Sequence, residues 1–433
     1  MASIKACNDW HVRVVSRRLV KASDTSIKHH VVTVSNLDII ARILQVSMFC
    51  VYAKPPAGEF DAVVAAFEAG LPSFLNHFFP LAGRIAMDNT SSGVPVVHCS
   101  NQGAELVVGE AGVMLRSLDY GAMGPSLQKI ELPYGEDMAL SVQVVSFACG
   151  GFTVAWRTNH VVVDGCALSS LVSAWSAFTR SGGTLPAAVR RPNYDRSIFR
   201  PRSPPSYSAS LDAAFTPLDA RCQVNCLTAD HSSAASRGGE RATRVQAVSA
   251  YLWKALAGVV GTADSSCRMG WWVNGRRRLT APELRAAVRN YFGNVITFVG
   301  GEASVQEVLR MPLPDVAAMV RDAITAPAYD EHFLELVDWV EEHKTEQPIP
   351  TASIGLGSPT VIVTAFTSFP INTDFGFGQA VMAVPTSVRT VRLCSGFVQI
   401  LAAALESDEP RVFKPLTADK LGLFAPQVGC SRL

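Results

Sequence analysis

The feature that most constrains this chain is a histidine and an aspartate four residues apart in an otherwise apolar run, Asn159-His-Val-Val-Val-Asp-Gly165. Two apolar, β-branched stretches precede it and meet at Cys149-Gly-Gly151, which predicts two strands joined by a tight turn. After it, apolar residues recur at helical spacing until Gly182-Gly183. The run is therefore predicted to form the turn between a buried strand and a helix. Such a turn can hold a side chain rigidly at the edge of a cavity, as a general base requires.

The same pattern has an ordinary interpretation. An H-x-x-x-D spacing arises by chance in roughly a third of chains with this many histidines, and a lone histidine on an apolar turn is usually a hydrogen-bonded core residue. Cys166 could act as a nucleophile beside His160, but it enters an apolar helix, so buried packing is the better interpretation. The pattern alone leaves catalysis by His160 open.

Length and charge narrow the class of protein. A chain of 433 residues is long enough for two or three domains. Its 38 Lys and Arg nearly balance its 37 Asp and Glu, so the chain has no net electrostatic field that would attract nucleic acid or an anionic membrane. We find neither a secretory signal nor a run approaching the roughly 20 apolar residues of a membrane span. We therefore expect a soluble cytoplasmic protein with a small-molecule partner.

The cysteines and the arginine cluster are less informative. Ten scattered cysteines fit a reducing compartment, and the close pair Cys222 and Cys226 has only His231 nearby, so no metal site is predicted. Arg276, Arg277 and Arg278 follow an apolar stretch. Three adjacent arginines are typical of solvated charge or of a phosphate contact, and the short run does not separate the two.

Strand and helix patterns alternate in both halves of the chain, which predicts an α/β fold. Between Gly183 and Leu218, prolines interrupt a stretch without sustained periodicity, as expected of a long crossover loop. We therefore expect two mixed-sheet domains of similar size, residues 1–184 and 223–433, joined by a crossover loop at residues 185–222.

A second distinctive stretch is Asp374-Phe375-Gly376-Phe377-Gly378. Asp-Phe-Gly occurs in protein kinases, but this chain has no H-R-D catalytic loop and no glycine-rich loop before a V-A-I-K strand. It also lacks the G-x-S-x-G turn of serine hydrolases and the glycine motifs of nucleotide sites. These classes are excluded.

Taken together, the two stretches resemble the BAHD family of plant acyl-CoA-dependent acyltransferases. That family is marked by H-x-x-x-D-G in mid-chain and D-F-G-W-G about two hundred residues later. Weaker family features also match, namely Ser35-Asn-Leu-Asp38, Phe79-Pro-Leu-Ala-Gly-Arg84, Gln143 to Gly151, Gly275-Arg276 with Arg278-Leu279, and Tyr291-Phe-Gly-Asn294. The likeness spans nearly the whole chain.

The resemblance implies a fold and an activity. It implies two domains of the coenzyme A-dependent acyltransferase type with an active-site channel between them, in a protein that is a monomer by the family's habit. The family transfers an acyl group, here by analogy hydroxycinnamoyl or another aromatic acyl, from coenzyme A to a hydroxyl or amine. Acyl-CoA is a co-substrate, and no permanently bound cofactor is implied. His160 would act as the general base on two substrates held together.

The resemblance also assigns supporting roles. Asp164 would anchor the loop that carries His160 by pairing with an arginine, for which Arg276 is the first candidate and Arg278 the second. Gly165 would permit the tight turn. The segment from Asp374 to Gly378 would be structural, near the coenzyme A channel. Arg244 is a candidate for a coenzyme A phosphate contact, but ordinary surface charge is the better interpretation of this residue.

This chain departs from the family pattern at two places. Phe377 replaces a tryptophan, which removes an indole N–H. The stretch from Val363 to Thr373 has no arginine to bind an acceptor carboxylate, which favours a neutral alcohol or an amine as acceptor. Two rivals stay open: a noncatalytic relative that binds or scaffolds, and a thioester hydrolase in which His160 activates water.

Overall fold

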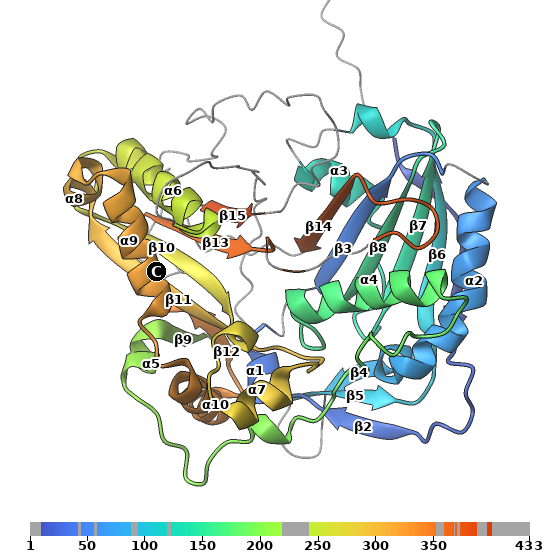
Figure 1. Cartoon of the computed structure of the whole chain (residues 1–433), viewed down its shortest axis with the longest axis horizontal. Coiled ribbons are helices and arrows are strands. Elements are labelled where there is room, and N and C mark those ends of the chain that lie inside the picture. Colours follow the sequence, from blue (N-terminus) through green and yellow to red (C-terminus); the bar gives the residue numbers. More distant parts are fainter. Residues whose placement is uncertain are drawn as a thin grey trace, which may run out of the picture.

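The computed structural model describes residues 10–41, 45–55, 59–87, 94–118, 123–218, 242–351, 359–367, 369, 373–387 and 396–400. Within these ranges two mixed sheets stand side by side with helices packed against them (Figure 1), so the α/β prediction is confirmed. No helix in the described ranges has both the length and the apolarity to cross a membrane. The same ranges contain no cluster of three metal-ligating side chains. The Cys222 and Cys226 pair lies outside them.

The first sheet has the strand order β1-β6-β7-β8-β3-β14. Its members are β1 (Val12–Val20), β3 (Gln45–Tyr52), β6 (Ala104–Ala111), β7 (Ser141–Phe147), β8 (Phe152–Asn159) and β14 (Met382–Ser387). All neighbours pair antiparallel except β6 and β7, which are parallel. The predicted pair of strands before His160 is confirmed as the β7–β8 hairpin, and Gly150 in its turn has a φ of 77°.

Two long helices cover one face of this sheet. They are α2 (Phe60–His77) and α4 (Gly165–Arg180), and α4 crosses in front of the strands in Figure 1. Their apolar stripes meet in an aromatic core, where the Phe67 ring stacks on Trp175 at 4.8 Å between centroids and packs on Trp156 at 5.8 Å. The helical spacing after His160 is thus explained by burial against β8. The opposite face of the sheet is covered by α3 (Met123–Ile130).

The second sheet has the strand order β11-β10-β13-β15. Its members are β10 (Ser266–Asn274), β11 (Ile296–Ser304), β13 (Thr360–Ala365) and β15 (Gly396–Ile400). The helices of this half are α6 (Arg244–Val260), α7 (Pro282–Val288), α8 (Val305–Arg310), α9 (Leu313–Thr325) and α10 (Tyr329–His343). Apolar residues recur at helical spacing in the sequence over residues 245–260, 305–309, 317–324 and 333–340, and these stretches are α6, α8, α9 and α10.

Smaller elements complete the fold below the two main sheets. One small sheet contains β2 (His30–Thr33), β4 (Arg84–Met87) and β5 (Pro95–Cys99), and another contains β9 (Phe215–Leu218) and β12 (Gln347–Pro350). The short helices α1 (Asn36–Ile39) and α5 (Ser210–Ala214) lie near α10 in Figure 1. The crossover loop pairs with the segment after α7, where the Asn193 N–H donates to the Asn290 carbonyl at 2.8 Å.

Each half of the molecule contains a segment from the other end of the chain. Strand β14 comes late in the chain but pairs with β3 in the first sheet, from Met382 opposite Val51 to Ser387 opposite Val46. Helix α1 comes early but buries Leu37 in the core of the second half. The boundaries predicted at residues 184 and 223 stay a prediction, and any such division of the chain is crossed by these two segments.

A close backbone approach in the first half yields a test of this packing. A Cβ on Gly83 would lie 2.3 Å from the carbonyl oxygen of His98, a backbone atom that cannot move aside cheaply. We expect Gly83→Ala to lower the free energy of unfolding by about 2–3 kcal/mol, measured by denaturant titration. Gly258→Ala is the matched control. A Cβ there would meet nothing within 4 Å inside helix α6, so stability should stay equal or rise by up to about 1 kcal/mol. Equal losses in both variants would contradict this packing.

Candidate active site

His160 is the first residue after strand β8, and the four residues that follow, 161–164, lead the chain into helix α4. The turn is closed by the Val162 N–H, which donates to the Asn159 carbonyl at 3.0 Å, and by the Val161 N–H, which donates to the Asn159 side chain at 2.9 Å. Val161 and Val163 are buried in the aromatic core. The predicted strand-to-helix turn is therefore present, and its apolar residues fix the position of the imidazole.

The imidazole of His160 is held by Asn294, from the turn before β11. Nδ1 of His160 lies 2.9 Å from Oδ1 of Asn294, and Nδ2 of Asn294 donates to the His160 carbonyl at 2.7 Å. The same Nδ2 donates to Oδ1 of Asp38 at 2.9 Å. The glycine in Asn290-Tyr-Phe-Gly-Asn294 indicates a turn, but the sequence does not predict this contact, because nothing local links residue 294 to residue 160.

The surroundings of His160 act on its pKa in opposite directions. Burial of the ring lowers the pKa below its usual value, while the nearby carboxylates of Asp164 and Asp38 and the bond to Asn294 oppose that shift. The net direction is downward, so the ring is neutral at pH 7 and has a free lone pair. A neutral imidazole at this pH is suited to accept a proton.

Asp164 is occupied by other partners. It caps helix α4, where Oδ1 accepts from the Ala167 N–H at 2.9 Å. Oδ2 accepts from the Val295 N–H at 3.0 Å and forms an ion pair with Nη1 of Arg276. The Asp164 side chain is 1% exposed, and Arg276 beside it is 9% exposed. Both oxygens point to backbone and guanidinium donors, so Asp164 joins the turn to the second half of the molecule.

Of the two predicted arginine partners, the structure places Arg276 at Asp164. The second guanidinium nitrogen of Arg276 donates to the carbonyls of Tyr291 at 3.1 Å and Gly293 at 2.8 Å. These bonds tie the end of β10 to the turn that carries Asn294. Arg278 instead lies over the ring of Tyr329, 5.7 Å from its centroid.

Two further residues of the turn have neighbours that limit their roles. A Cβ on Gly165 would lie 2.5 Å from Cε1 of Phe366, so only glycine allows the segment after β13 to approach the turn. Phe366 packs edge-on against Phe369 at 5.5 Å. Burial raises the pKa of the Cys166 thiol, which makes it a poor nucleophile and supports its interpretation as a packing residue.

The segment from Asp374 to Gly378 folds against the first half of the molecule. Oδ1 of Asp374 accepts from the N–H groups of Gly376 at 2.9 Å and Gly378 at 3.1 Å, and both glycines have positive φ. Phe375 enters the aromatic core, and Phe377 packs on it at 5.2 Å between centroids. The segment thus anchors the connection between β13 and β14 to α2 and α4.

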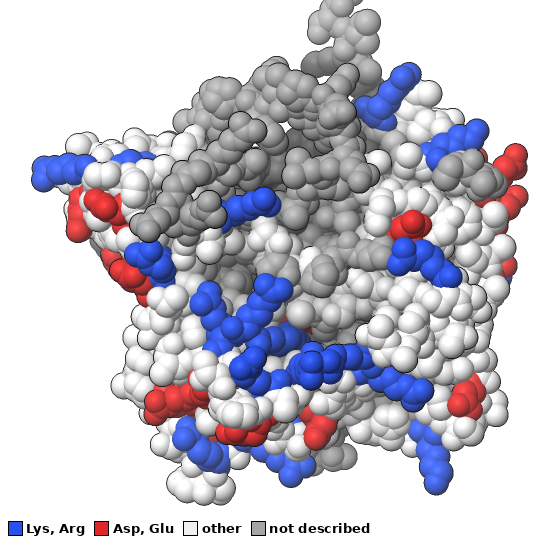
Figure 2. Space-filling model, viewed as in Figure 1, with Lys and Arg blue, Asp and Glu red and all other residues white. Residues whose placement is uncertain are grey.

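Arg244 lies apart from this cluster. It is exposed in the first turn of α6, directly after the N-cap Thr243. Within the described ranges it makes no hydrogen bond or ion pair with the turn that carries His160. Figure 2 shows a separate band of Lys and Arg side chains crossing the lower middle of one face, over the region where α7 lies in Figure 1.

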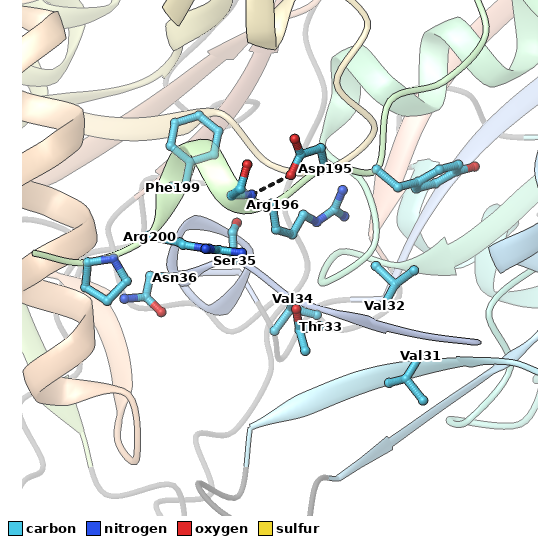
Figure 3. A pocket seen from close by; sticks show the side chains of 13 residues that line it. Val31, Val32, Thr33, Val34, Ser35, Asn36, Asp195, Arg196, Phe199 and Arg200 are labelled. Atoms are coloured by element: carbon cyan, nitrogen blue, oxygen red, sulfur yellow. Dashed lines mark hydrogen bonds between the residues drawn. The ribbon is translucent and has the colours of Figure 1, made fainter.

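A cavity of about 320 Å³ lies between the segment after β2 and the crossover loop (Figure 3). Its walls come from residues 31–36 and from the crossover loop at residues 194–201, and they include Ser35 and Arg196. Both of these residues contact the Oδ2 atom of Asp38, whereas Oδ1 faces Asn294. The lining contains no residue of the turn from His160 to Asp164, so this cavity is separate from that turn.

This chain is similar to known proteins over most of its length. A protein-family model described as the Transferase family matches residues 10–392. Putrescine hydroxycinnamoyltransferase 1 of Oryza sativa subsp. japonica is 28% identical over 404 residues, which cover 85% of this chain and 88% of that relative.

Two solved structures share the fold. Vinorine synthase matches with a TM-score of 0.64 at 19% identity, over 90% of this chain and 91% of that one. The F. graminearum TRI101 protein, crystallised with coenzyme A and T-2 mycotoxin, matches with a TM-score of 0.65 at 14% identity, over 82% of this chain and 89% of that one. Because the family model matches most of its length, the chain belongs to this transferase family, the BAHD acyltransferases.

Proposed function

We propose that this protein transfers an acyl group from an acyl-CoA thioester to an amine or hydroxyl, with His160 as the general base. The observation that carries the proposal is the bond from His160 Nδ1 to Asn294 Oδ1. An amide oxygen only accepts, so the ring carries its proton on Nδ1 and has its lone pair on Nε2. The downward shift of the His160 pKa keeps that lone pair free at pH 7.

The reaction follows from these two properties. Nε2 takes the acceptor's proton as the acceptor nitrogen or oxygen attacks the thioester carbonyl carbon. The tetrahedral intermediate then expels coenzyme A as the thiolate when the carbon–sulfur bond breaks. The imidazolium returns its proton to that thiolate, which leaves coenzyme A as the thiol and His160 neutral. No covalent acyl-enzyme is required.

Asp164 does not complete a catalytic triad in this scheme. Its oxygens accept from Ala167, Val295 and Arg276. An aspartate that orients a histidine must hydrogen-bond to the imidazole, and here Asn294 has that position. We assign Asp164, Gly165 and Arg276 to support of the turn, and the segment from Asp374 to Gly378 to support of the neighbouring connection.

The substrates are inferred from chemistry and from likeness. The stretch from Val363 to Thr373 contains no arginine, so an acceptor carboxylate has no cationic partner there. The similar rice protein is named for putrescine and for a hydroxycinnamoyl group. We therefore put an aliphatic diamine first among acceptors, followed by neutral alcohols, and hydroxycinnamoyl-CoA first among donors.

The coenzyme A moiety carries phosphates that call for cationic partners. Arg244 is exposed at the start of α6 and stays a candidate for a phosphate contact. A fold neighbour has been crystallised with coenzyme A, which supports acyl-CoA as the co-substrate. A monomeric state stays a prediction from the resemblance, and a cytoplasmic location stays a prediction from the sequence.

The direct test is release of coenzyme A thiol, measured with hydroxycinnamoyl-CoA and benzoyl-CoA donors and pooled amines and alcohols, with products identified by mass spectrometry. We expect turnover that depends on the acceptor. His160→Ala should lower kcat by about 100- to 10,000-fold, the usual contribution of a general base. Acceptor-independent release would establish the hydrolase rival. Unchanged turnover in His160→Ala would refute the role of His160, and the absence of any turnover would favour the noncatalytic rival.

A second experiment tests the support assigned to Arg276. In Arg276→Lys the bonds to the Tyr291 and Gly293 carbonyls are lost, because one ammonium cannot reproduce the planar guanidinium. We expect a loss of about 2–3 kcal/mol in the free energy of unfolding together with a fall in kcat. Arg278→Lys is the matched control and should cost under about 1 kcal/mol, since only a ring contact is weakened. If the two variants behaved alike, the assignment of Arg276 would be wrong.

A further inference from the structure

Asp38 lies directly behind the amide that contacts His160, and the reaction described above does not use it. Its side chain is fully buried. Oδ1 accepts from the backbone N–H of Asn294 at 2.7 Å and from its Nδ2 at 2.9 Å. Oδ2 accepts from the N–H of Ser35 at 2.8 Å and from its hydroxyl at 2.9 Å, and lies 3.3 Å from Nε of Arg196. All of these neighbours are donors.

These contacts fix the orientation of the Asn294 side-chain amide. Its NH2 group donates to Asp38 Oδ1 and to the His160 carbonyl, so the amide oxygen faces His160 Nδ1. If the amide were turned over, its oxygen would lie against two other oxygens, and each contact would be repulsive. The NH2 group would then face Nδ1, which would have to accept, and the ring proton would move to Nε2.

We propose that Asp38 is a positioning residue for acyl transfer, which by fixing the Asn294 amide keeps the His160 proton on Nδ1 and leaves Nε2 as the base. The proposal rests on the proposed role of His160. Arg196 of the crossover loop offsets the buried charge of Asp38 and lies over the Tyr291 ring, 4.7 Å from its centroid. Asp38 thus joins α1, the crossover loop and the turn before β11 behind the imidazole.

The charged groups around His160 fix the sign of the expected pH effect. Burial lowers the pKa of His160, whereas the charges of Asp164 and Asp38 raise it. Arg276 is paired with Asp164, and Arg196 with Asp38. Removing the charge of Asp38 should therefore lower the His160 pKa further. The acid limb of the kcat/KM profile should then move to lower pH.

The test compares Asp38→Asn with Asp338→Asn. Asp338 is an equally buried carboxylate that also holds the crossover loop, where it accepts from the N–H groups of Arg202 at 2.8 Å and Ser206 at 2.9 Å and pairs with the Arg202 guanidinium. It lies in helix α10 and does not contact Asn294 or His160. Both variants should lose stability on thermal unfolding, because each leaves donors facing a new NH2 group.

Of the two variants, only Asp38→Asn should change the rate of acyl transfer and its dependence on pH. We expect its plateau kcat to fall about 10- to 100-fold, less than the loss caused by a wholly wrong tautomer in a serine protease because the His160 carbonyl still favours the native amide orientation. Its KM should change little, and the acid limb of its kcat/KM profile should move to lower pH. Asp338→Asn should keep the wild-type plateau and profile. Equal plateau rates in the two variants would overturn the proposal.

A measurement independent of turnover completes the test. In ¹⁵N-histidine-labelled wild-type protein at pH 7.5, with His160 assigned by comparison with His160→Ala, the ring should carry its proton on Nδ1. In Asp38→Asn a population protonated on Nε2 should appear. A wild-type spectrum with the proton on Nε2 would overturn the proposal, even if Asp38→Asn does not fold. Failure of the proposed function would instead appear as an absence of turnover in wild-type protein.

Discussion

The buried ion pair between Asp164 and Arg276 is the interaction on which the site depends. It links the first turn of α4, in the first half of the molecule, to the end of β10 in the second half. Removing one member of a buried pair costs about 3–5 kcal/mol because the other charge is left without a partner. The pair is therefore a strong constraint on how the two halves meet, and His160 lies on the loop that it fixes.

Around this ion pair, the buried polar groups where the two halves meet form hydrogen bonds with one another. The turn before β11 receives bonds from Arg276 on its carbonyls and gives N–H bonds to Asp164 and Asp38. The side chain of Asn294 in turn hydrogen-bonds to the ring and to the carbonyl of His160. Buried polar networks of this kind are stable only when their members are paired, so the His160 imidazole is held by a set of bonds that is costly to rearrange. The aromatic core beneath α4 supports the same turn from the other side.

Much of this arrangement could be predicted from local pattern. The β7–β8 hairpin, the turn at His160 and helix α4 follow from the spacing of apolar residues and glycines. The pairing of Asp164 with Arg276 was a prediction of the resemblance, and the structure has that ion pair. What escaped prediction is the pairing of strands with distant partners. The apolar run at Val381 to Val384 indicates a strand, and β14 is that strand, but its place beside β3 depends on contacts between distant parts of the chain. Strand β11 shows no local sign that it would pair with β10.

The contact of Asn294 with His160 escaped prediction for the same reason. A turn at Tyr291 to Asn294 is visible in the sequence, but the direction of one amide depends on a carboxylate from residue 38 and a carbonyl from residue 160. No pattern within a window of the chain contains that information.

In the proposed reaction, Nε2 of His160 receives the acceptor's proton. A crystal structure of the protein with coenzyme A and an unreactive acceptor analogue bound together tests this directly. We expect the acceptor nitrogen or oxygen about 2.6–3.2 Å from Nε2, with Nδ1 still bonded to Asn294 and the coenzyme A sulfur beside the acceptor. An acceptor bound out of reach of Nε2, or an imidazole turned so that Nε2 is bonded to the protein, would contradict it.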